Sequence, residues 1–329
     1  MRPFFNFLHY FIILPRTYIR VKAINRTLSE LKKEIVKDPK WKAIIQKKDF
    51  ELRMTQYVQV HSLLDYSLCG LAGRSISEKE LKACVYFCAC LPLYDDFFDK
   101  NNLSGDEIKA LMKAPSNFVP KTPLEGLFIH LLKEVYRNLP NPALFAQYFE
   151  GLYYGQEESK KLLNPNLSFE EVEKIAFEKG GYSALLFRSI LKHPLIEGEE
   201  EALYQLGAVG QLLDDLFDLW DDLEEGVNTI ATKFDSDFNV VFNRYEIEVK
   251  KLKDLFLNLN YNVIHKHTFI RELMLMVNGG TLCGQQYIQL QKQNGGVFDI
   301  QKLERKQLIC DMEDKSNWYK MVKLSISNA

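Results

Sequence analysis

The sequence contains few of the residues that interrupt helices. Of its 329 residues, only 17 are glycine and 11 are proline. No stretch alternates between apolar and polar residues with a period of two, which is the pattern typical of half-buried strands. Apolar residues instead recur three and four positions apart. We therefore expect an all-α fold of about ten helices.

Cysteine is also scarce, and its spacing suggests neither a zinc site nor a redox motif. The six cysteines include no CxxC pair, and three of them (Cys84, Cys88 and Cys90) lie in one apolar run. The six histidines show no metal-binding spacing either. We interpret the cysteines as reduced, buried residues of a cytoplasmic protein without a zinc ion.

Strong charge and long apolar segments are likewise missing. The formal net charge is −2, which gives no sign of a nucleic-acid partner. Residues 1–40 form an aromatic and basic segment with no acid before Glu30. Its apolar part is too short to span a bilayer, and Pro15 interrupts it. We expect residues 1–40 to pack on the rest of the protein. The alternative is an interfacial contact with a membrane, which would make the protein membrane-associated.

Start and stop signals divide the remainder into helices. Ser77 with Glu80, and Ser168 with Glu171, form capping boxes. No linker or low-complexity tract separates the helices, so we expect residues 41–329 to form one helical domain, either alone or as a homodimer. Residues that break helices fall between the periodic segments at Asn101-Asn102, Pro120, Pro140 with Pro142, Asn164-Pro165, His193-Pro194 and Gly295-Gly296.

Two acidic motifs of the form DDxxD occur far apart in the chain. An acidic cluster on a helix is usually a solvated face. Here, however, no charged residue occurs from Ala202 to Leu213, directly before the second motif, so that helix continues into the protein interior. The motifs comprise Asp95, Asp96 and Asp99, and then Asp214, Asp215 and Asp218 with Asp222 one turn further on.

The face that carries the first motif also becomes apolar upstream. Residues one turn apart share a helix face, so the face that carries Asp95 also carries Leu91, Cys88 and Cys84. Acids at the rim and small or apolar residues below them predict a deep apolar pocket. The candidates for its lining are Leu91, Cys88, Cys84, Phe87, Phe98, Tyr204, Gly207 and Gln211.

Carboxylates crowded at such a rim need cations to remain ionised. With no cysteine or histidine nearby, the expected cation is Mg²⁺, which binds oxygen ligands together with phosphate groups. Asp214, Asp218 and Asp222 are spaced to bind metal along one helix edge. Asp95 and Asp99 would bind metal from the opposite wall. The ions would then hold a diphosphate over a pocket suited to an apolar tail and a carbocation.

At these residues the sequence resembles the class I isoprenoid synthases, which comprise the trans-prenyltransferases and the class I terpene cyclases. The strongest match is QLLDDLFD, from Gln211 to Asp218, which is similar to the QxxDDxxD motif of that family. The resemblance implies the all-α isoprenoid synthase fold, with the active site at the centre of a helical bundle. It also implies a prenyl diphosphate substrate and three Mg²⁺ ions, with all seven motif aspartates as candidate metal ligands.

A second match lies between the two motifs. SFEEVEKIAFEKGGYSALLF resembles the segment that brings the central lysine of the family, here Lys179, to the diphosphate. We expect Gly180 and Gly181 to break this helix and to direct Lys179 inward. The implied catalytic residues are Asp95, Asp99, Asp214 and Lys179, and the candidate diphosphate ligands are Lys179, Asn228, Lys233, Arg188 and Tyr319.

The chain also departs from the pattern of the chain-elongating members. Their GGKRxRP segment is missing near Arg53, and Lys100-Asn101-Asn102 replaces a pair of arginines. Loss of these cations favours an enzyme that ionises one prenyl diphosphate and rearranges or cyclises the carbocation. The intact QxxDDxxD favours the alternative, a prenyltransferase that joins two isoprenoid units head-to-tail or head-to-head. The third hypothesis is a non-catalytic binding or regulatory member of the fold.

Overall fold

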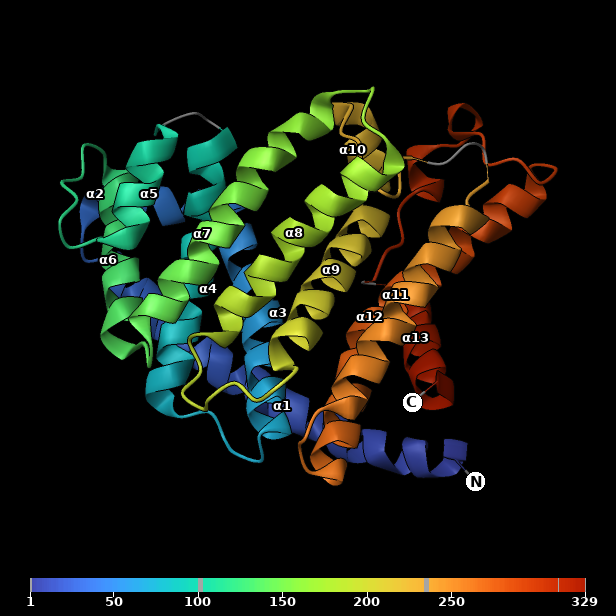
Figure 1. Cartoon of the computed structure of the whole chain (residues 1–329), viewed down its shortest axis with the longest axis horizontal. Helices are drawn as coiled ribbons and strands as arrows, with labels where there is room; N and C mark the ends of the chain where they lie inside the picture. The colour runs from blue at the N-terminus through green and yellow to red at the C-terminus, as the bar shows by residue number, and fades with distance from the viewer. Residues whose placement is uncertain (1, 100–102, 234–236, 313, 329) are drawn as a thin grey trace. The chain divides into compact units, whose positions relative to one another are not determined.

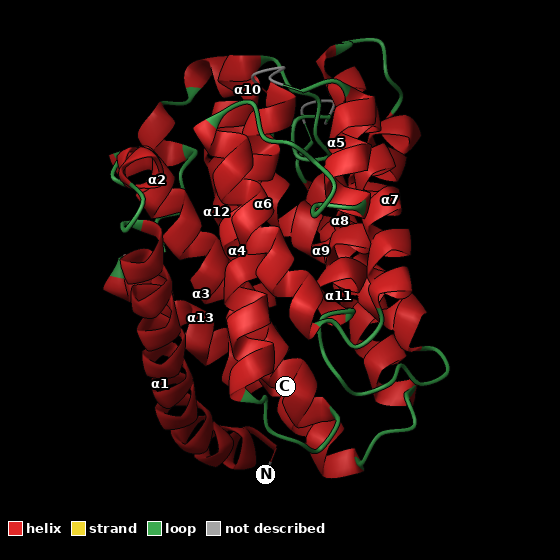
Figure 2. Cartoon of the chain, turned by 90° about the vertical axis from the view of Figure 1, so that its left-hand side faces the viewer, coloured by secondary structure: helices red, strands yellow, loops and turns green. Residues whose placement is uncertain are grey.

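The computed structural model of this protein consists of helices and their connections (Figures 1 and 2). It describes residues 2–99, 103–233, 237–312 and 314–328, without the side chains of residues 2–12, 99, 301 and 328. Within these residues there is no β-strand, which confirms the all-α prediction.

Thirteen α-helices occur in the described residues, together with three short 3₁₀ helices. The sequence predicted about ten, and α2, α5 and α10 are the short ones, with seven to nine residues each. Helices this short give little periodic signal. The α-helices are α1 (Arg2–Ile35), α2 (Pro39–Ile45), α3 (Lys48–Leu71), α4 (Glu78–Asp99), α5 (Gly105–Lys113), α6 (Pro123–Asn138), α7 (Pro142–Ser159), α8 (Phe169–Arg188), α9 (Glu199–Phe217), α10 (Leu219–Glu225), α11 (Asn239–Asn258), α12 (Val263–Gln293) and α13 (Lys315–Asn328), and the 3₁₀ helices are Lys160–Leu163, Ile300–Lys302 and Arg305–Gln307.

The local signals for helix ends are confirmed where the structure describes them. At the start of α8, the Ser168 N–H donates to Glu171 and the Glu171 N–H donates to Ser168 Oγ. The predicted breakers lie between helices with two exceptions: Pro142 is the first residue of α7, and Asn101-Asn102 fall outside the described residues. One expectation is wrong: Pro15 does not interrupt the N-terminal segment, because α1 runs through it.

The chain forms two compact units. The N-terminal unit comprises Phe11–Glu150 and Leu186–Pro194. The C-terminal unit comprises Met1–Tyr10, Gly151–Leu185 and Leu195–Ala329. Each unit is described by itself below. A single domain over residues 41–329, and a homodimer, stay predictions.

The core of the N-terminal unit lies between α3, α4 and α6. Helix α4 packs against both α3 and α6, and α2 contacts the same two neighbours. Helix α1 joins this unit through Ile24, Leu28, Leu31 and Ile35, which recur every three or four residues and are buried. No helix within the described part of the chain combines the length and the apolar character needed to cross a membrane. An interfacial contact through the N-terminal segment stays a prediction.

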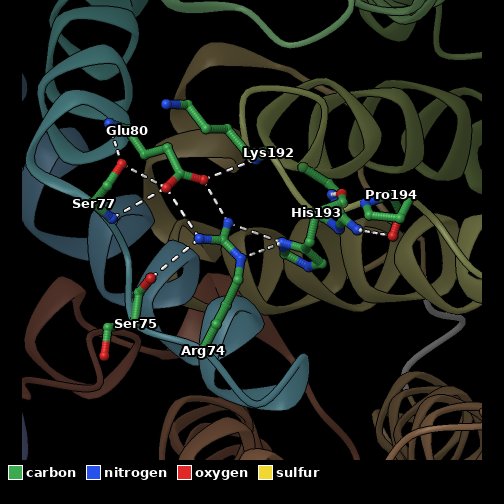
Figure 3. A network of polar contacts seen from close by, with 8 residues as sticks. Arg74, Ser75, Ser77, Glu80, Lys192, His193 and Pro194 are labelled. Atoms are coloured by element: carbon green, nitrogen blue, oxygen red, sulfur yellow. Dashed lines mark hydrogen bonds and ion pairs between the residues drawn. The ribbon is translucent and has the colours of Figure 1, made fainter.

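A buried carboxylate ties the start of α4 to the segment after α8 in this unit (Figure 3). Glu80 is 1% exposed and accepts hydrogen bonds from Arg74 Nη1 at 3.0 Å and from the Lys192 N–H at 2.8 Å. It also accepts from the Ser77 N–H at 3.1 Å, which confirms the predicted capping box. Arg74 Nε in turn contacts His193 Nδ1 at 3.1 Å.

The C-terminal unit is organised around α9, which packs against α10, α11 and α12 (Figure 1). Helices α11 and α12 approach closely because α12 carries glycines at the contact. A Cβ atom on Gly280 would lie 2.4 Å from Tyr245 Oη, and one on Gly284 would lie 2.2 Å from the Phe242 ring. Helix α13 packs against α12.

Candidate functional site

Helices α8 and α9 cross at a pair of glycines. A Cβ atom on Gly180 would lie 2.2 Å from the Gly207 carbonyl oxygen, and one on Gly207 would lie 1.9 Å from the Gly180 carbonyl oxygen. The two backbones can touch only because neither residue has a side chain. Lys179 directly precedes this crossing on α8, and Gln211 follows it by one turn on α9. The crossing therefore brings Lys179 to the acidic end of α9.

This geometry corrects two expectations. Gly180 and Gly181 do not break a helix, because α8 is continuous from Phe169 to Arg188. Close helix packing is what requires these glycines: a Cβ atom on Gly181 would lie 2.4 Å from the ring of Tyr204. Gly207 and Tyr204, both predicted to line a tail pocket, are therefore in contact with α8.

A cavity of about 150 Å³ lies next to the crossing, within the C-terminal unit. One wall is an apolar face of α8, and the other carries carboxylates from α9 and α10. Residues of the loop after α10 complete its lining. The lining comprises Leu162, Val172, Ile175, Ala176, Lys179, Gln211, Asp214, Asp215, Asp218, Asp222, Val227, Asn228 and Thr229.

The structure thus gathers Lys179, Gln211, Asn228 and the four aspartates of the second motif around one cavity. Gln211, predicted for the tail pocket, lies among the acids instead, with Nε2 at 3.2 Å from Asp215 Oδ1. Val172, Ile175 and Ala176 were not among the residues predicted from the sequence. These three residues share a helix face with Lys179 through their three- and four-residue spacing, which is the signal that could have identified them.

The acidic residues do not lie on one helix, as the spacing had predicted. Helix α9 ends at Phe217, Asp218 has φ −92° and ψ 8°, and α10 begins at Leu219. The Leu216 carbonyl accepts hydrogen bonds from Tyr287 Oη at 3.1 Å and Cys283 Sγ at 3.3 Å, both on α12. Side chains that insert into the backbone hydrogen-bond pattern are a known cause of such breaks.

The break leaves the acids on one side of the chain. The Asp218 N–H donates to the Asp214 carbonyl at 2.9 Å, and the Asp222 N–H donates to the Asp218 carbonyl at 2.9 Å. Backbone hydrogen bonds of helical spacing therefore continue on both sides of the break. All three carboxylates still line the cavity.

These carboxylates are held where ionisation is unfavourable. Burial, followed by repulsion from neighbouring carboxylates, raises the pKa of Asp218 to about 7. Burial also raises the pKa of Asp222 to about 6 and outweighs its hydrogen bond with Thr229. For Asp214, burial raises the pKa even though the charge of Lys179 acts in the other direction. Water can reach Asp214 and Asp218, but the surrounding protein limits how well they are hydrated.

Asp215 differs from the other three because it is only 4% exposed. Its Oδ2 accepts a hydrogen bond from the Ile230 N–H at 3.2 Å, and its pKa is raised by burial to about 7. Asp215 thereby fastens the loop after α10 to the end of α9. This contact fixes the position of Asn228 and Thr229 at the cavity.

Two of the predicted diphosphate ligands belong to this loop. The Asn228 side-chain nitrogen donates to the carbonyls of Leu162 and Asn164, the latter at 3.1 Å. Its amide oxygen is therefore the group that could contact a ligand in the cavity. Lys233 Nζ donates to the Pro165 carbonyl at 3.0 Å and does not line the cavity.

The chemistry of the donor set fits a hard divalent cation. Carboxylates and an amide oxygen are the ligands that Mg²⁺ prefers. Among the described residues, no three His, Cys, Asp or Glu side chains are placed to hold a metal ion by themselves. Mg²⁺ is commonly bound by one or two carboxylates, with phosphate oxygens of the substrate completing the shell. The cavity therefore fits Mg²⁺ that binds together with a diphosphate.

The first motif lies in the N-terminal unit. Tyr57 Oη donates to Asp95 Oδ2 at 3.0 Å, and Arg53 Nη2 forms an ion pair with Asp96 Oδ1 at 3.0 Å. The side chain of Asp99 lies outside the described residues. The metal-binding role of this motif on an opposite wall stays a prediction.

The predicted tail pocket along α4 is filled with side chains in this unit. Cys84 and Cys88 are fully buried, and Leu91 is half-buried. Phe87 packs edge-on against Phe187, at 5.1 Å between ring centroids. Phe98 packs in the same way against Tyr94. A prenyl tail could follow this face only if these side chains moved.

The remaining predicted diphosphate ligands lie away from the cavity. Arg188 is 1% exposed and donates to the carbonyls of His193 at 3.0 Å and Pro194 at 3.1 Å. These bonds tie down the segment after α8. Tyr319 on α13 is 67% exposed. Neither residue lines the cavity next to Lys179.

Comparisons with known proteins do not assign a family. No protein-family model matches the chain, and no curated protein is significantly similar to it. The features that bear on function are therefore the spacing of the motifs and the cavity beside the Gly180–Gly207 crossing.

Proposed function

We propose that this protein is a Mg²⁺-dependent isoprenoid synthase that ionises a prenyl diphosphate and rearranges or cyclises the carbocation. The observation that carries the proposal is the cavity that joins Lys179 to Asp214, Asp218 and Asp222. Crowded carboxylates with raised pKa values call for added positive charge. Metal ions bound together with a diphosphate would supply this positive charge.

The carboxylates of the cavity and Asn228 would each have a role in this reaction. Asp214, Asp218 and Asp222 would hold Mg²⁺, with the Asn228 amide oxygen as a further ligand. When bound, the ions would stabilise the charge that develops on the departing diphosphate. Asp215 positions the loop that carries Asn228.

Lys179 would supply a fixed positive charge to the same leaving group. It lies close enough to Asp214 to affect the pKa of that carboxyl. A cation held beside the developing negative charge lowers the barrier to ionisation. Val172, Ile175 and Ala176 form the apolar wall next to it and keep water away from this side of the cavity.

One contact supports the use of a single diphosphate. Arg53 is the basic residue nearest the segment that would hold a second diphosphate in chain-elongating enzymes. It forms ion pairs with Asp96 at 3.0 Å and with Asp49 at 3.3 Å. Its charge is thus already balanced by two carboxylates within its own unit, which favours ionisation of one substrate over condensation of two.

Product analysis tests the proposal. The purified protein is incubated with geranyl, farnesyl and geranylgeranyl diphosphate and Mg²⁺, with and without isopentenyl diphosphate, and the extracts are analysed by gas chromatography and mass spectrometry. We expect a hydrocarbon or alcohol from one prenyl diphosphate alone. Longer prenyl diphosphates formed only with isopentenyl diphosphate would identify a prenyltransferase instead. No product under any condition would contradict both activities.

A further inference from the structure

Helix α1 has two faces of different character where its side chains are described. Ile24, Leu28 and Leu31 are at most 4% exposed and pack on the N-terminal unit. Arg20 also faces this unit, because its guanidinium carbon lies 5.5 Å from the ring centroid of Tyr66 on α3. This side of the helix therefore attaches α1 to the protein.

The other side of α1 is exposed. Tyr18 and Ile19 are 61% and 67% exposed, and Pro15, Arg16 and Lys22 beside them are exposed as well. Residues three, four and seven positions apart share a side of a helix, so positions 15, 18, 19 and 22 form one strip, with Arg16 at its edge. We call these five residues the exposed face of α1. Lone exposed apolar residues are common on protein surfaces, but here two are adjacent and have a cation on either side.

The strip continues toward the N-terminus in the sequence pattern. Helix α1 runs without interruption from Arg2, and positions 4, 8 and 11 fall on the same side of it as positions 15 and 18. These positions hold Phe4, Leu8 and Phe11, whereas Asn6 and His9 fall on the other side. The exposed face is therefore part of a longer apolar strip.

Positive charge is concentrated in the same segment. Residues 1–29 contain five Lys and Arg residues and no Asp or Glu, although the whole chain has a net charge of −2. Lys22 Nζ lies 4.6 Å from the ring centroid of Tyr18, so the cation and the ring are side by side on the exposed face. Arg26, one turn further on, pairs with Glu30 at 3.3 Å. Acidic residues therefore join this helix only beyond the exposed face.

This combination fits the boundary of a lipid bilayer. A helix that lies in that boundary places apolar residues at the edge of the acyl chains and basic residues among the head groups, with tyrosine between them. Anionic lipids attract Lys and Arg near the membrane surface. Because the rest of the chain has an excess of acids, the basic segment determines how the protein approaches an anionic surface.

We propose that the exposed face of α1 binds bilayers that contain anionic lipids. Tyr18 and Ile19 enter the boundary between head groups and acyl chains, and Arg16 and Lys22 contact the lipid phosphates or carboxylates. The opposite face keeps its contacts with the N-terminal unit, so α1 holds the protein at the membrane without detaching from it. Binding is reversible, because a single strip of this kind buries little apolar area. The inference is independent of the proposed enzyme activity, since lipid binding requires no substrate.

Vesicle sedimentation tests the lipid. The full-length protein is mixed with vesicles of phosphatidylcholine, or of phosphatidylcholine with phosphatidylserine, and the bound fraction is measured at low and at high salt. We expect binding to the vesicles that contain phosphatidylserine, and loss of this binding at high salt, because salt screens exposed charges. Equal binding to both kinds of vesicle, or no binding to either, would overturn the proposal.

Substitutions on α1 test the face. Lys22→Ala removes one cation and should lower the partition coefficient onto anionic vesicles about five-fold. Ile19→Ser should lower it several-fold by removing apolar area. Because both side chains are exposed, these variants should keep the thermal midpoint of the parent.

Lys251→Ala and Ile264→Ser are the matched controls. They change an exposed lysine on α11 and a 72% exposed isoleucine on α12. Both controls should bind anionic vesicles as the parent does. If the controls lose as much affinity as the α1 variants, or if the α1 variants lose none, the protein binds through another surface and the proposal is wrong.

Discussion

The backbones of Gly180 and Gly207 touch where α8 crosses α9, so that a Cβ atom on Gly207 would overlap the Gly180 carbonyl oxygen at 1.9 Å. Lys179 and Asp214 reach the same cavity because the helices meet so closely. Separating the helices would enlarge the cavity and move the lysine away from the carboxylates. Stability and ligand binding should therefore depend on the same pair of glycines.

The first prediction is that Gly207→Ala destabilises the C-terminal unit. The methyl group cannot be accommodated without displacing backbone on α8, and overpacking of this kind typically costs about 1–3 kcal/mol. Chemical denaturation should report the lower free energy of unfolding. Binding of inorganic diphosphate in the presence of Mg²⁺ should weaken at the same time.

Gly210→Ala provides the matched control. Gly210 lies three residues later on α9, and a Cβ atom there would meet nothing within 4 Å. Alanine is the better helix former, so this variant should be more stable than the parent by about 0.5–1 kcal/mol. If both variants respond alike, the close crossing does not determine stability.

The second prediction concerns the charge of Lys179. Lys179→Met keeps an unbranched side chain but removes the cation from the cavity. A hydrogen bond to a charged group typically contributes about 1.5–3 kcal/mol, so the affinity for inorganic diphosphate with Mg²⁺ should fall about 10- to 100-fold. Isothermal titration calorimetry measures this change directly.

Lys174→Met is the corresponding control on α8. Its side chain is 75% exposed and pairs with Glu178 at 3.9 Å, away from the cavity. Its affinity for diphosphate should match that of the parent. Equal affinity in Lys179→Met as well would show that the charge of Lys179 does not contribute to diphosphate binding.

The third prediction is a loss of stability in acid that depends on Glu80. Burial opposes ionisation of this carboxyl, but hydrogen bonds from Arg74, Lys192 and Ser77 outweigh it and lower its pKa from 4.5 to about 2. A carboxyl whose folded pKa is depressed stabilises the fold above its unfolded pKa. That contribution, on the order of 3 kcal/mol, is lost as the pH falls from 4.5 toward 2.

Urea denaturation of Glu80→Gln at several pH values checks this account. The variant should be less stable than the parent at pH 7. The difference between their free energies of unfolding should become smaller as the pH drops below about 4.5. Burial and nearby arginines lower the pKa of His193 to about 3, so its protonation destabilises both proteins in the same direction. Glu78→Gln, at an exposed position in the same turn, should cost at most about 1 kcal/mol. If the difference in free energy of unfolding between the parent and Glu80→Gln does not change with pH, the hydrogen bonds to ionised Glu80 do not stabilise the fold as stated.

The ends of the long helices could be predicted because capping residues and breakers act locally. Ser77 and Ser168 form the bonds that their spacing predicts. The break at Asp218 could not be predicted, because it depends on the bonds that Leu216 accepts from Cys283 and Tyr287, which lie 67 and 71 residues from Leu216 along the chain. Neither residue carries a local sign of such a contact.

The candidate site was predictable to the extent that it depends on spacing. The second motif and Lys179 were identified, and the structure places them around one cavity. The role of Gly180 was mistaken, since a glycine at a close helix crossing has the same sequence signature as one that ends a helix. The role of Gly207 was also mistaken. Its missing side chain suggested open space in a tail pocket, but the backbone of α8 occupies that space.

The fourth prediction addresses the tail pocket along α4. Cys88 is fully buried against protein in the structure. Cys88→Phe should therefore lower the midpoint of thermal unfolding through overpacking, by a few degrees or more. A variant of unchanged stability that rejects long prenyl diphosphates and accepts short ones would instead show that this face lines the tail channel.

The most direct measurement is the rate at which inorganic diphosphate is released from a prenyl diphosphate in the presence of Mg²⁺. The parent protein should release it, and chelation of the metal should stop the reaction. Asp218→Asn, at the centre of the acidic cavity, should be slower by about 100-fold or more. Asp221→Asn, at a side chain that is 66% exposed and outside the cavity, should retain the parent rate. Equal rates for the two variants, or no release by the parent from any chain length, would contradict the proposed function.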